Sequence, residues 1–278
     1  MTNLEFTLLV ALGSLVAGFL GALTGLGGGV VIVPLLALVF GVDIHYAIGA
    51  SLVSVIATSS GAAAAYVREG FTNVRIGMFL EVATTLGAIG GAHLAGLISG
   101  SGIAVVFGVV LLASAYLSGR HQDAPPAEGE PDPIAQRLRL DGEYPTPDGP
   151  HSYRVRRVPL GFAMMLFAGM LSGLLGIGSG AFKVLAMDHA MRIPFKVSTT
   201  TSNFMIGVTA AASAGIYFAR GYIDPALAMP VMLGVLVGSL LGARVLTHAQ
   251  PRVLRIVFAL VIVAVGMQMI YKGLTGNL

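Results

Sequence analysis

The chain has 278 residues, of which 55% are hydrophobic and 10% are charged, and its mean hydropathy is +0.85. Soluble globular domains carry about 25% charged residues, so this composition excludes a soluble core and indicates a polytopic membrane protein. The net charge of +3 does not point to a nucleic-acid partner, because most arginines lie at the ends of apolar segments, where orientation in the membrane explains them.

The first apolar segment runs from Leu4 to Phe40. No basic stretch precedes it, so we expect a retained first helix rather than a cleaved signal. A helix of this length would reach about 55 Å, whereas the hydrocarbon core of a bilayer is about 30 Å thick. The segment is interrupted by Gly25-Leu26-Gly27-Gly28-Gly29. We therefore predict a broken hairpin: one helix in, a glycine tip, and a short returning helix over Val30 to Phe40.

Three further apolar runs predict membrane helices before the composition changes. Between Gly119 and Arg157 the chain is rich in Pro, Asp, Glu and Gly, which predicts a polar, poorly ordered linker. We expect transport to survive deletion of Asp123 to Gly149. The three predicted helices are Tyr46 to Val67, Ile76 to Ile98 and Ile103 to Leu117.

The second half of the chain begins in the same way as the first. Val158 to Ala190 is interrupted by Gly176-Ile177-Gly178-Ser179-Gly180, which predicts a second broken hairpin with a returning helix over Ala181 to Ala190. Three apolar runs follow, at Val197 to Phe218, Ala226 to Leu246 and Val253 to Tyr271.

The two halves are copies of each other. Residues 18 to 94 match residues 169 to 245 without a gap, at an offset of 151 that places Gly18 on Gly169 and Ser51 on Ser202. An internal duplication in a very hydrophobic chain is typical of a secondary transporter, whose site lies where the halves meet. We divide the chain into a first transmembrane repeat (1–118), a polar linker (119–157) and a second transmembrane repeat (158–278).

The basic residues test the hairpin interpretation. If each hairpin were a single crossing, eight Lys and Arg residues would share one side, against four on the other. If the chain turns back at the glycines, ten share one side and only Arg220 and Lys272 lie opposite, which obeys the positive-inside rule better. This predicts inverted repeats, both termini outside and a cytoplasmic linker, whether the tips cross fully or re-enter. The ten are Arg68, Arg75, Arg120, Arg154, Arg156, Arg157, Arg192, Lys196, Arg252 and Arg255.

The glycine tips predict an anion site. A tip leaves backbone N–H groups free at the start of the returning helix, where the helix dipole is positive. Transporters use such interrupted helices to hold anionic groups near the midplane, although the glycines could instead serve only close packing. The tip residues are Gly25, Gly27, Gly28 and Gly29 in the first repeat and Gly176, Gly178, Ser179 and Gly180 in the second.

Lys183 supports the anion interpretation. It lies one turn past Gly180 among apolar neighbours, and its repeat equivalent is Ile32. A charged residue in an apolar segment is costly and normally faces a cavity or a partner. The alternative is that Lys183 snorkels to the interface.

Uncharged donors and one carboxylate complete the candidate site. Hydroxyls recur at helical spacing after each hairpin, and we select Ser51, Ser202 and the adjacent Asn203 as substrate contacts; the alternative for a hydroxyl is a bond to its own or a neighbouring helix. Glu81, which Met232 replaces in the second repeat, is a candidate proton-coupling group or a partner of an interfacial arginine such as Arg75.

Motifs of other chemistries are absent from the sequence. It has no HExxH, GxSxG or Walker pattern, and no cysteine for a thiolate metal site. We therefore expect no catalytic residues, no metal and no cofactor.

The pattern as a whole resembles the TauE/SafE sulfite exporter family, also called the toluene sulfonate uptake permease family. The residues that carry the resemblance are Gly18-Phe-Leu-Gly21-Ala-Leu-Thr-Gly25-Leu-Gly27-Gly28-Gly29, Pro34, Ala47-Ile-Gly-Ala-Ser51-Leu, and the second copy around Gly176-Ile-Gly-Ser-Gly180. The resemblance covers nearly all of the chain except the linker, and it implies a carrier of the bacterial inner membrane for sulfite, sulfoacetate, other organosulfonates or thiosulfate. Ser179 departs from the glycine pattern.

The predicted fold is an all-α polytopic membrane protein with two inverted repeats, each opening with a glycine-tipped hairpin. The predicted function is export of a small sulfur-containing anion by a secondary transporter, driven by a proton gradient or the membrane potential. Uptake of the same anions, a passive anion channel and a membrane-embedded enzyme remain alternatives. The expected partners are a small anion and membrane lipid, without nucleic acid; the sequence leaves the oligomeric state open.

Overall fold

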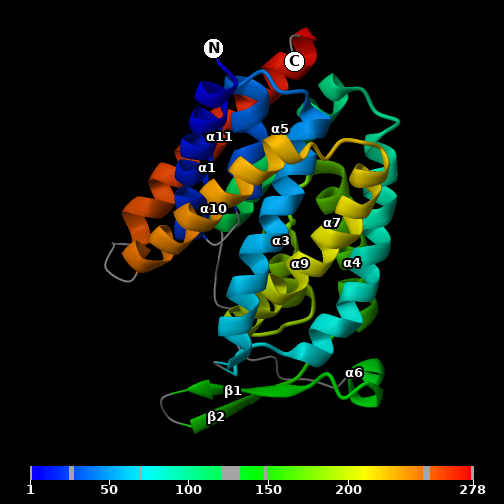
Figure 1. Cartoon of the computed structure of the whole chain (residues 1–278). Helices are drawn as coiled ribbons and strands as arrows, with labels where there is room; N and C mark the ends of the chain where they lie inside the picture. Colours follow the sequence, from blue (N-terminus) through cyan, green and yellow to red (C-terminus); the bar gives the residue numbers. More distant parts are fainter. Residues whose placement is uncertain are drawn as a thin grey trace.

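A computed structural model describes residues 2–24, 28–68, 70–119, 132–146, 149–246 and 251–276. The chain is a helical bundle with a small hairpin at one end (Figure 1). Its elements are α1 (Asn3–Thr24), α2 (Gly29–Pro34), the π-helical turn η1 (Leu35–Val39), α3 (Ile44–Arg68), α4 (Val74–Ala95), α5 (Gly100–Gly119), α6 (Pro133–Arg137), β1 (Gly142–Thr146), β2 (Gly149–Tyr153), α7 (Val158–Leu175), α8 (Gly180–Leu185), the π-helical turn η2 (Ala186–Ala190), α9 (Phe195–Ala219), α10 (Pro225–Leu246) and α11 (Pro251–Thr275).

The element boundaries repeat at the offset found in the sequence. Every residue bound of α2, η1, α3 and α4 recurs 151 positions later in α8, η2, α9 and α10. Equivalent caps recur as well: the Asn73 side chain accepts from the Ile76 N–H at the start of α4, and Asp224 accepts from the Ala226 N–H at the start of α10. Both broken hairpins and all six other predicted membrane helices are therefore confirmed, with ends shifted by a few residues.

Each repeat packs against the other through glycine seams. Helix α1 lies along α10, and its repeat equivalent α7 lies along α4 (Figure 1). A Cβ at Gly87 would collide with the Leu166 carbonyl, and one at Gly238 with the Leu15 carbonyl, which are repeat-equivalent contacts. Only glycine lets these backbones approach so closely. Close packing is thus the role of these glycines.

Helices α3 and α9 cross the bundle side by side in opposite directions (Figure 1). At one end, His45 in the first turn of α3 stacks on Tyr222, which follows the end of α9. At the other end, Lys196 in the first turn of α9 lies over the ring of Phe71, which follows the end of α3. Equivalent helices are therefore antiparallel.

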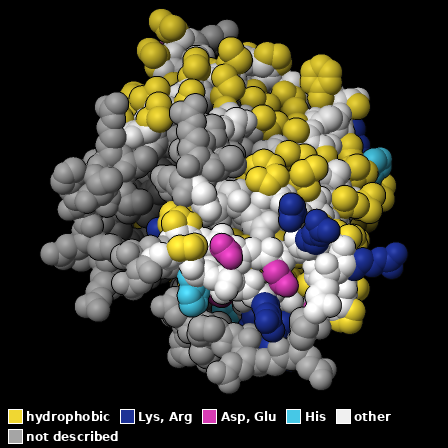
Figure 2. Space-filling model, turned by 90° about the horizontal axis from the view of Figure 1, so that it is seen from below, with side chains coloured by type: hydrophobic (Ala, Val, Ile, Leu, Met, Phe, Trp, Pro, Cys, Tyr) yellow, Lys and Arg dark blue, Asp and Glu magenta, His cyan; other side chains and the backbone are white. Residues whose placement is uncertain are grey.

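The outer faces of the bundle are apolar. Five helices among the described residues are long and apolar enough to cross a membrane, and four shorter apolar helices accompany them. Large aliphatic side chains at Leu4, Leu8, Leu12 and Val16 form an exposed stripe along α1, as lipid contact requires. Seen from the linker end, charged side chains gather in the middle of the face, with hydrophobic ones along its upper and right edges (Figure 2).

The prediction of a poorly ordered linker is wrong for residues 132–146 and 149–157. Strands β1 and β2 pair as an antiparallel hairpin at the end of the bundle (Figure 1). Leu140 and Val155 are buried against Ile76 and Met187 of the membrane helices, so this segment adds to the core. Asp123 and its neighbours up to residue 131 lie outside the described residues.

Polar contacts anchor the linker to both repeats. The Asn73 side-chain N–H groups donate to the Leu140 carbonyl (3.1 Å) and the Tyr153 hydroxyl (2.7 Å). Burial raises the pKa of Tyr153 to about 12, so its hydroxyl stays neutral. The Asp132 carboxylate accepts from the Ile134 N–H (2.8 Å) and, through its other oxygen, from the Val158 N–H (3.0 Å) at the start of α7.

Candidate functional site

The described end of the first glycine tip lies against the second tip. Gly29, the first residue of α2, lies beside the second tip: a Cβ there would come within 2.9 Å of the Gly176 carbonyl oxygen and 2.8 Å of the Ser51 hydroxyl. The predicted contacts Gly25 and Gly27 lie outside the described residues. Gly28 packs against Val235 of α10 and Gly18 of α1, on the flank of the meeting point.

The second tip is buried and uses left-handed backbone. Gly176 (φ +67°) ends α7, and Gly178 (φ +70°) and Ser179 (φ +43°) lead into α8. Ser179 adopts this unusual conformation with its hydroxyl donating to the Ala168 carbonyl of α7, at 2.5 Å. Its repeat equivalent Gly28 is right-handed (φ −63°), so the two tips differ in backbone conformation as well as in sequence.

The selected serines bind the second tip. Ser51 of α3 donates to the Gly176 carbonyl at 2.8 Å, and its equivalent Ser202 of α9 donates to the Gly180 carbonyl at 3.3 Å. Their single hydroxyl hydrogens are engaged in this conformation, so they fix the tip. Asn203 is half-buried and makes no hydrogen bond to the described part of the chain. An amide without a partner in those ranges can donate to a ligand.

Lys183 is buried inside the bundle and does not reach an interface. Its side chain is 0% exposed, and its ammonium donates to the Thr209 hydroxyl of α9 at 2.6 Å. The Thr209 hydroxyl in turn lies 2.7 Å from Oε1 of Glu81 on α4, to which it donates. A chain of two short hydrogen bonds thus joins three elements from both repeats. We call Lys183, Thr209 and Glu81 the relay.

The relay leaves hydrogen-bonding capacity unused at both ends. Lys183 has three N–H donors, and one of them has a partner among the described residues. At the other end, Oε1 of Glu81 also accepts from Thr85 at 3.1 Å, whereas Oε2 is buried without a hydrogen-bond partner in the described ranges. An ammonium that can bind an oxyanion and a carboxylate oxygen that can bind a proton therefore lie one hydroxyl apart.

The relay exists in only one of the two copies. The equivalents of Lys183, Thr209 and Glu81 are Ile32, Thr58 and Met232. Within the described ranges, Thr58 donates only to carbonyls of its own helix, at Ser54 and Val55. Since the same backbone forms in the first copy with apolar residues at two of the three positions, the fold does not require the buried charges.

Sequence reasoning found Lys183 and Glu81 separately but missed what connects them. The connecting residue, Thr209, is one of the hydroxyls that recur at helical spacing along the helix after the second hairpin. Its neighbours come from helices far apart in the chain, and no spacing rule predicts such contacts. The alternative role for Glu81, a pairing with Arg75, does not occur among the described ion pairs.

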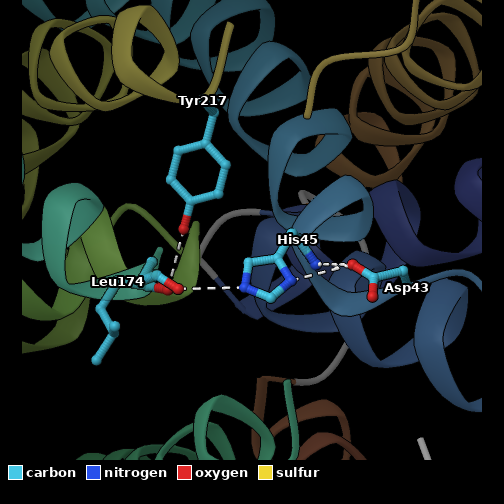
Figure 3. Close-up of polar contacts among 5 residues, drawn as sticks. Asp43, His45, Leu174 and Tyr217 are labelled. Carbon is cyan, nitrogen blue, oxygen red and sulfur yellow. Dashed lines mark hydrogen bonds and ion pairs between the residues drawn. The ribbon is translucent and has the colours of Figure 1, made fainter. Parts of the chain in front are cut away.

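A second polar cluster closes the end of the bundle opposite the linker (Figure 3). His45 Nδ1 lies 3.1 Å from an Asp43 carboxylate oxygen and Nε2 lies 3.1 Å from the Ala95 carbonyl, while Tyr217 donates to the Leu174 carbonyl at 3.3 Å. The imidazole also stacks on Tyr222 at 4.9 Å. These contacts tie the start of α3 to the ends of α4 and α9, and the end of α9 to α7. Within the described ranges, no three His, Asp or Glu side chains gather to hold a metal ion.

Comparison with known proteins identifies the family. The model of the family described as "Sulfite exporter TauE/SafE" matches residues 10–269, so the chain belongs to the TauE/SafE family. It is 29% identical to the probable membrane transporter protein YunE of Bacillus subtilis, over 98% of this chain and 99% of that protein. It is 28% identical to the probable membrane transporter YdhB of the same organism (86% and 88% covered) and to one from Xylella fastidiosa (98% of each). No solved structure matches. The chain is thus a multi-pass membrane protein of a transporter family.

Proposed function

We propose that this protein is a secondary carrier that exports a small sulfur-containing oxyanion, sulfite or an organosulfonate such as sulfoacetate, across the bacterial inner membrane. The proton gradient or the membrane potential drives the movement. The family description supports this substrate class, and the names of the relatives support transport.

The observation that carries the proposal is the fully buried ammonium of Lys183. It lies on the returning helix of the second hairpin, one turn after Gly180, and keeps unused donors. A buried charge in a membrane bundle is costly unless it has a functional partner. Sulfite and sulfonate groups present three oxygens, which can accept several N–H bonds at once. We place the anion at Lys183 and keep the half-buried amide of Asn203 and the glycine tips as further candidate contacts.

The proposed orientation follows from the charges and the antiparallel helices. Equivalent helices α3 and α9 run in opposite directions, as inverted repeats require. Basic residues cluster toward the linker end, which the positive-inside rule assigns to the cytoplasm. Both termini then face outward, and a site between the repeats is reachable from either side as the halves move.

Flux measurements in proteoliposomes test the proposed function. The purified protein should accelerate entry of labelled sulfite, thiosulfate or sulfoacetate, and unlabelled anion trapped inside should accelerate it further, because a carrier returns faster when loaded. Glucose and protein-free liposomes are the controls. Flux without such acceleration would identify a channel, and no flux of any of these anions would refute the substrate class.

A further inference from the structure

We propose that Glu81 is a proton-binding site that fills whenever an anion binds at Lys183, so that the carrier moves one proton with each singly charged anion. The inference rests on the proposed function, since it concerns how the anion site is coupled. It assigns the relay a task beyond holding the anion: through Thr209, anion binding at Lys183 changes proton binding at Glu81.

The first argument is the geometry of the relay. The Thr209 oxygen accepts from Lys183 at 2.6 Å, and its one hydrogen has two acceptors, Oε1 of Glu81 at 2.7 Å and the Met205 carbonyl at 3.0 Å, of which the carboxylate is the nearer. An anion that draws the ammonium toward itself weakens its bond to Thr209. The negative charge of the Glu81 carboxylate is then no longer balanced by the nearby ammonium of Lys183.

The second argument is charge balance. Without an anion, the buried ammonium and the buried carboxylate sum to zero. An added singly charged anion leaves one negative charge in excess within a membrane bundle, where unpaired charge is strongly disfavoured. A proton on Oε2 of Glu81, the oxygen that has no partner in the described ranges, restores neutrality. Transfer is a simple binding step: the proton comes from solution and returns to it when the anion leaves.

Other titratable groups do not replace Glu81 in this balance. Among the described elements packed against α4, helix α7 carries no titratable side chain. Helix α9 carries Lys196 over Phe71 in its first turn and Tyr217 near its far end. On α4 itself, Arg75 lies in the first turn and His93 in the last. Lys183 is therefore the charged group that faces Glu81.

The repeat supplies the third argument. The first copy has Ile32 and Met232 where the second site has Lys183 and Glu81, so both charges of the pair are missing together. This is expected if the two groups work as a unit, because either charge alone would be buried without its counter-charge.

The inference has a consequence for the driving force. A singly charged anion accompanied by one proton moves without net charge, so the membrane potential does not drive it. Export then follows the gradient of the substrate itself and is opposed by an acidic exterior, so this coupling replaces both driving forces named under the proposed function.

The test measures proton uptake during anion binding by the full-length protein. A lightly buffered solution with a pH-sensitive dye is mixed with methanesulfonate, a singly charged sulfonate that does not titrate near neutral pH, and calorimetry records the binding of methanesulfonate and of sulfite in parallel. The parent protein should take up about one proton per anion bound. Glu81→Gln, which mimics the protonated carboxyl, should bind the anion with no proton uptake and with an affinity that no longer changes with pH.

A second variant serves as a control for misfolding. Lys183→Ile combined with Glu81→Met reproduces the pair found in the first copy, so it should fold, bind the anion as weakly as a variant that lacks Lys183 alone, and take up no proton. Anion binding by the parent without proton uptake, or uptake that persists in Glu81→Gln, would overturn the coupling while leaving the carrier intact. Absence of anion binding by the parent would instead refute the proposed function itself.

Discussion

At the scale of single residues, Thr209 contributes both to the stability of the fold and to the proposed function. Its hydroxyl satisfies a buried ammonium and a buried carboxylate together. Replacing Thr209 with Val keeps the shape but leaves both groups without this partner, which costs about 1–3 kcal/mol for a buried polar group. We expect Thr209→Val to lower the free energy of unfolding by this amount and to weaken anion binding.

The first repeat offers the matched control. Thr58 occupies the equivalent position, and its hydroxyl bonds only within α3. Thr58→Val should leave unfolding in detergent and anion affinity almost unchanged. Equal effects of the two substitutions would show that the hydroxyl serves the helix and not the relay.

At the scale of elements, the glycine seams hold the two repeats together. An alanine at Gly87 would force its Cβ against the Leu166 carbonyl of α7, whereas Gly90 on the same helix has open space around it. Overpacking costs about 1–3 kcal/mol, while alanine in an open helical position is favoured by up to about 1 kcal/mol. Gly87→Ala should therefore unfold at a lower temperature in detergent than the parent, and Gly90→Ala at the same or a higher one. The reverse order would contradict the assigned packing.

The ordered part of the linker is an element in its own right. Asp132 caps α6 and also accepts from the first N–H of α7, and Leu140 is buried against the membrane helices. We therefore expect deletion of residues 121–131 to preserve transport, whereas deletion extended through Gly149 should reduce the amount of folded protein. Asp132→Ala should cost about 1 kcal/mol, as loss of a helix cap does. Normal expression and thermal stability of the longer deletion would show that the hairpin is dispensable.

The elements also show what the sequence could and could not predict. Glycine clusters and long apolar runs predicted both hairpins and every membrane helix, because membrane spans leave a strong local signal. The linker hairpin was missed because its prolines and charges indicated disorder. The Asp-Gly pair at positions 148 and 149 is a hairpin signal, but the prolines and charges around it outweighed this signal in the prediction. The relay could not be predicted, since its contacts depend on how distant helices pack.

At the scale of the whole molecule, the orientation in the membrane is a prediction that labelling can decide. The native chain has no cysteine, so single cysteines can be introduced without interference. A membrane-impermeant reagent should label Asn3→Cys and Thr275→Cys in intact cells, and Gln136→Cys of α6 only after the membrane is opened. Labelling of Asn3→Cys that requires opened membranes would contradict the inverted arrangement.

The central claim is that an anion binds at the buried ammonium of Lys183, between the two repeats, and calorimetric titration tests it most directly. Loss of a charge-assisted contact costs about 1.5–3 kcal/mol, so Lys183→Met should bind sulfite or sulfoacetate roughly ten- to a hundred-fold more weakly than the parent. Lys183→Arg should keep the charge but impair transport, because its planar fork does not fit a site shaped for an ammonium. A folded Lys183→Met protein that binds the anion as tightly as the parent would contradict the claim.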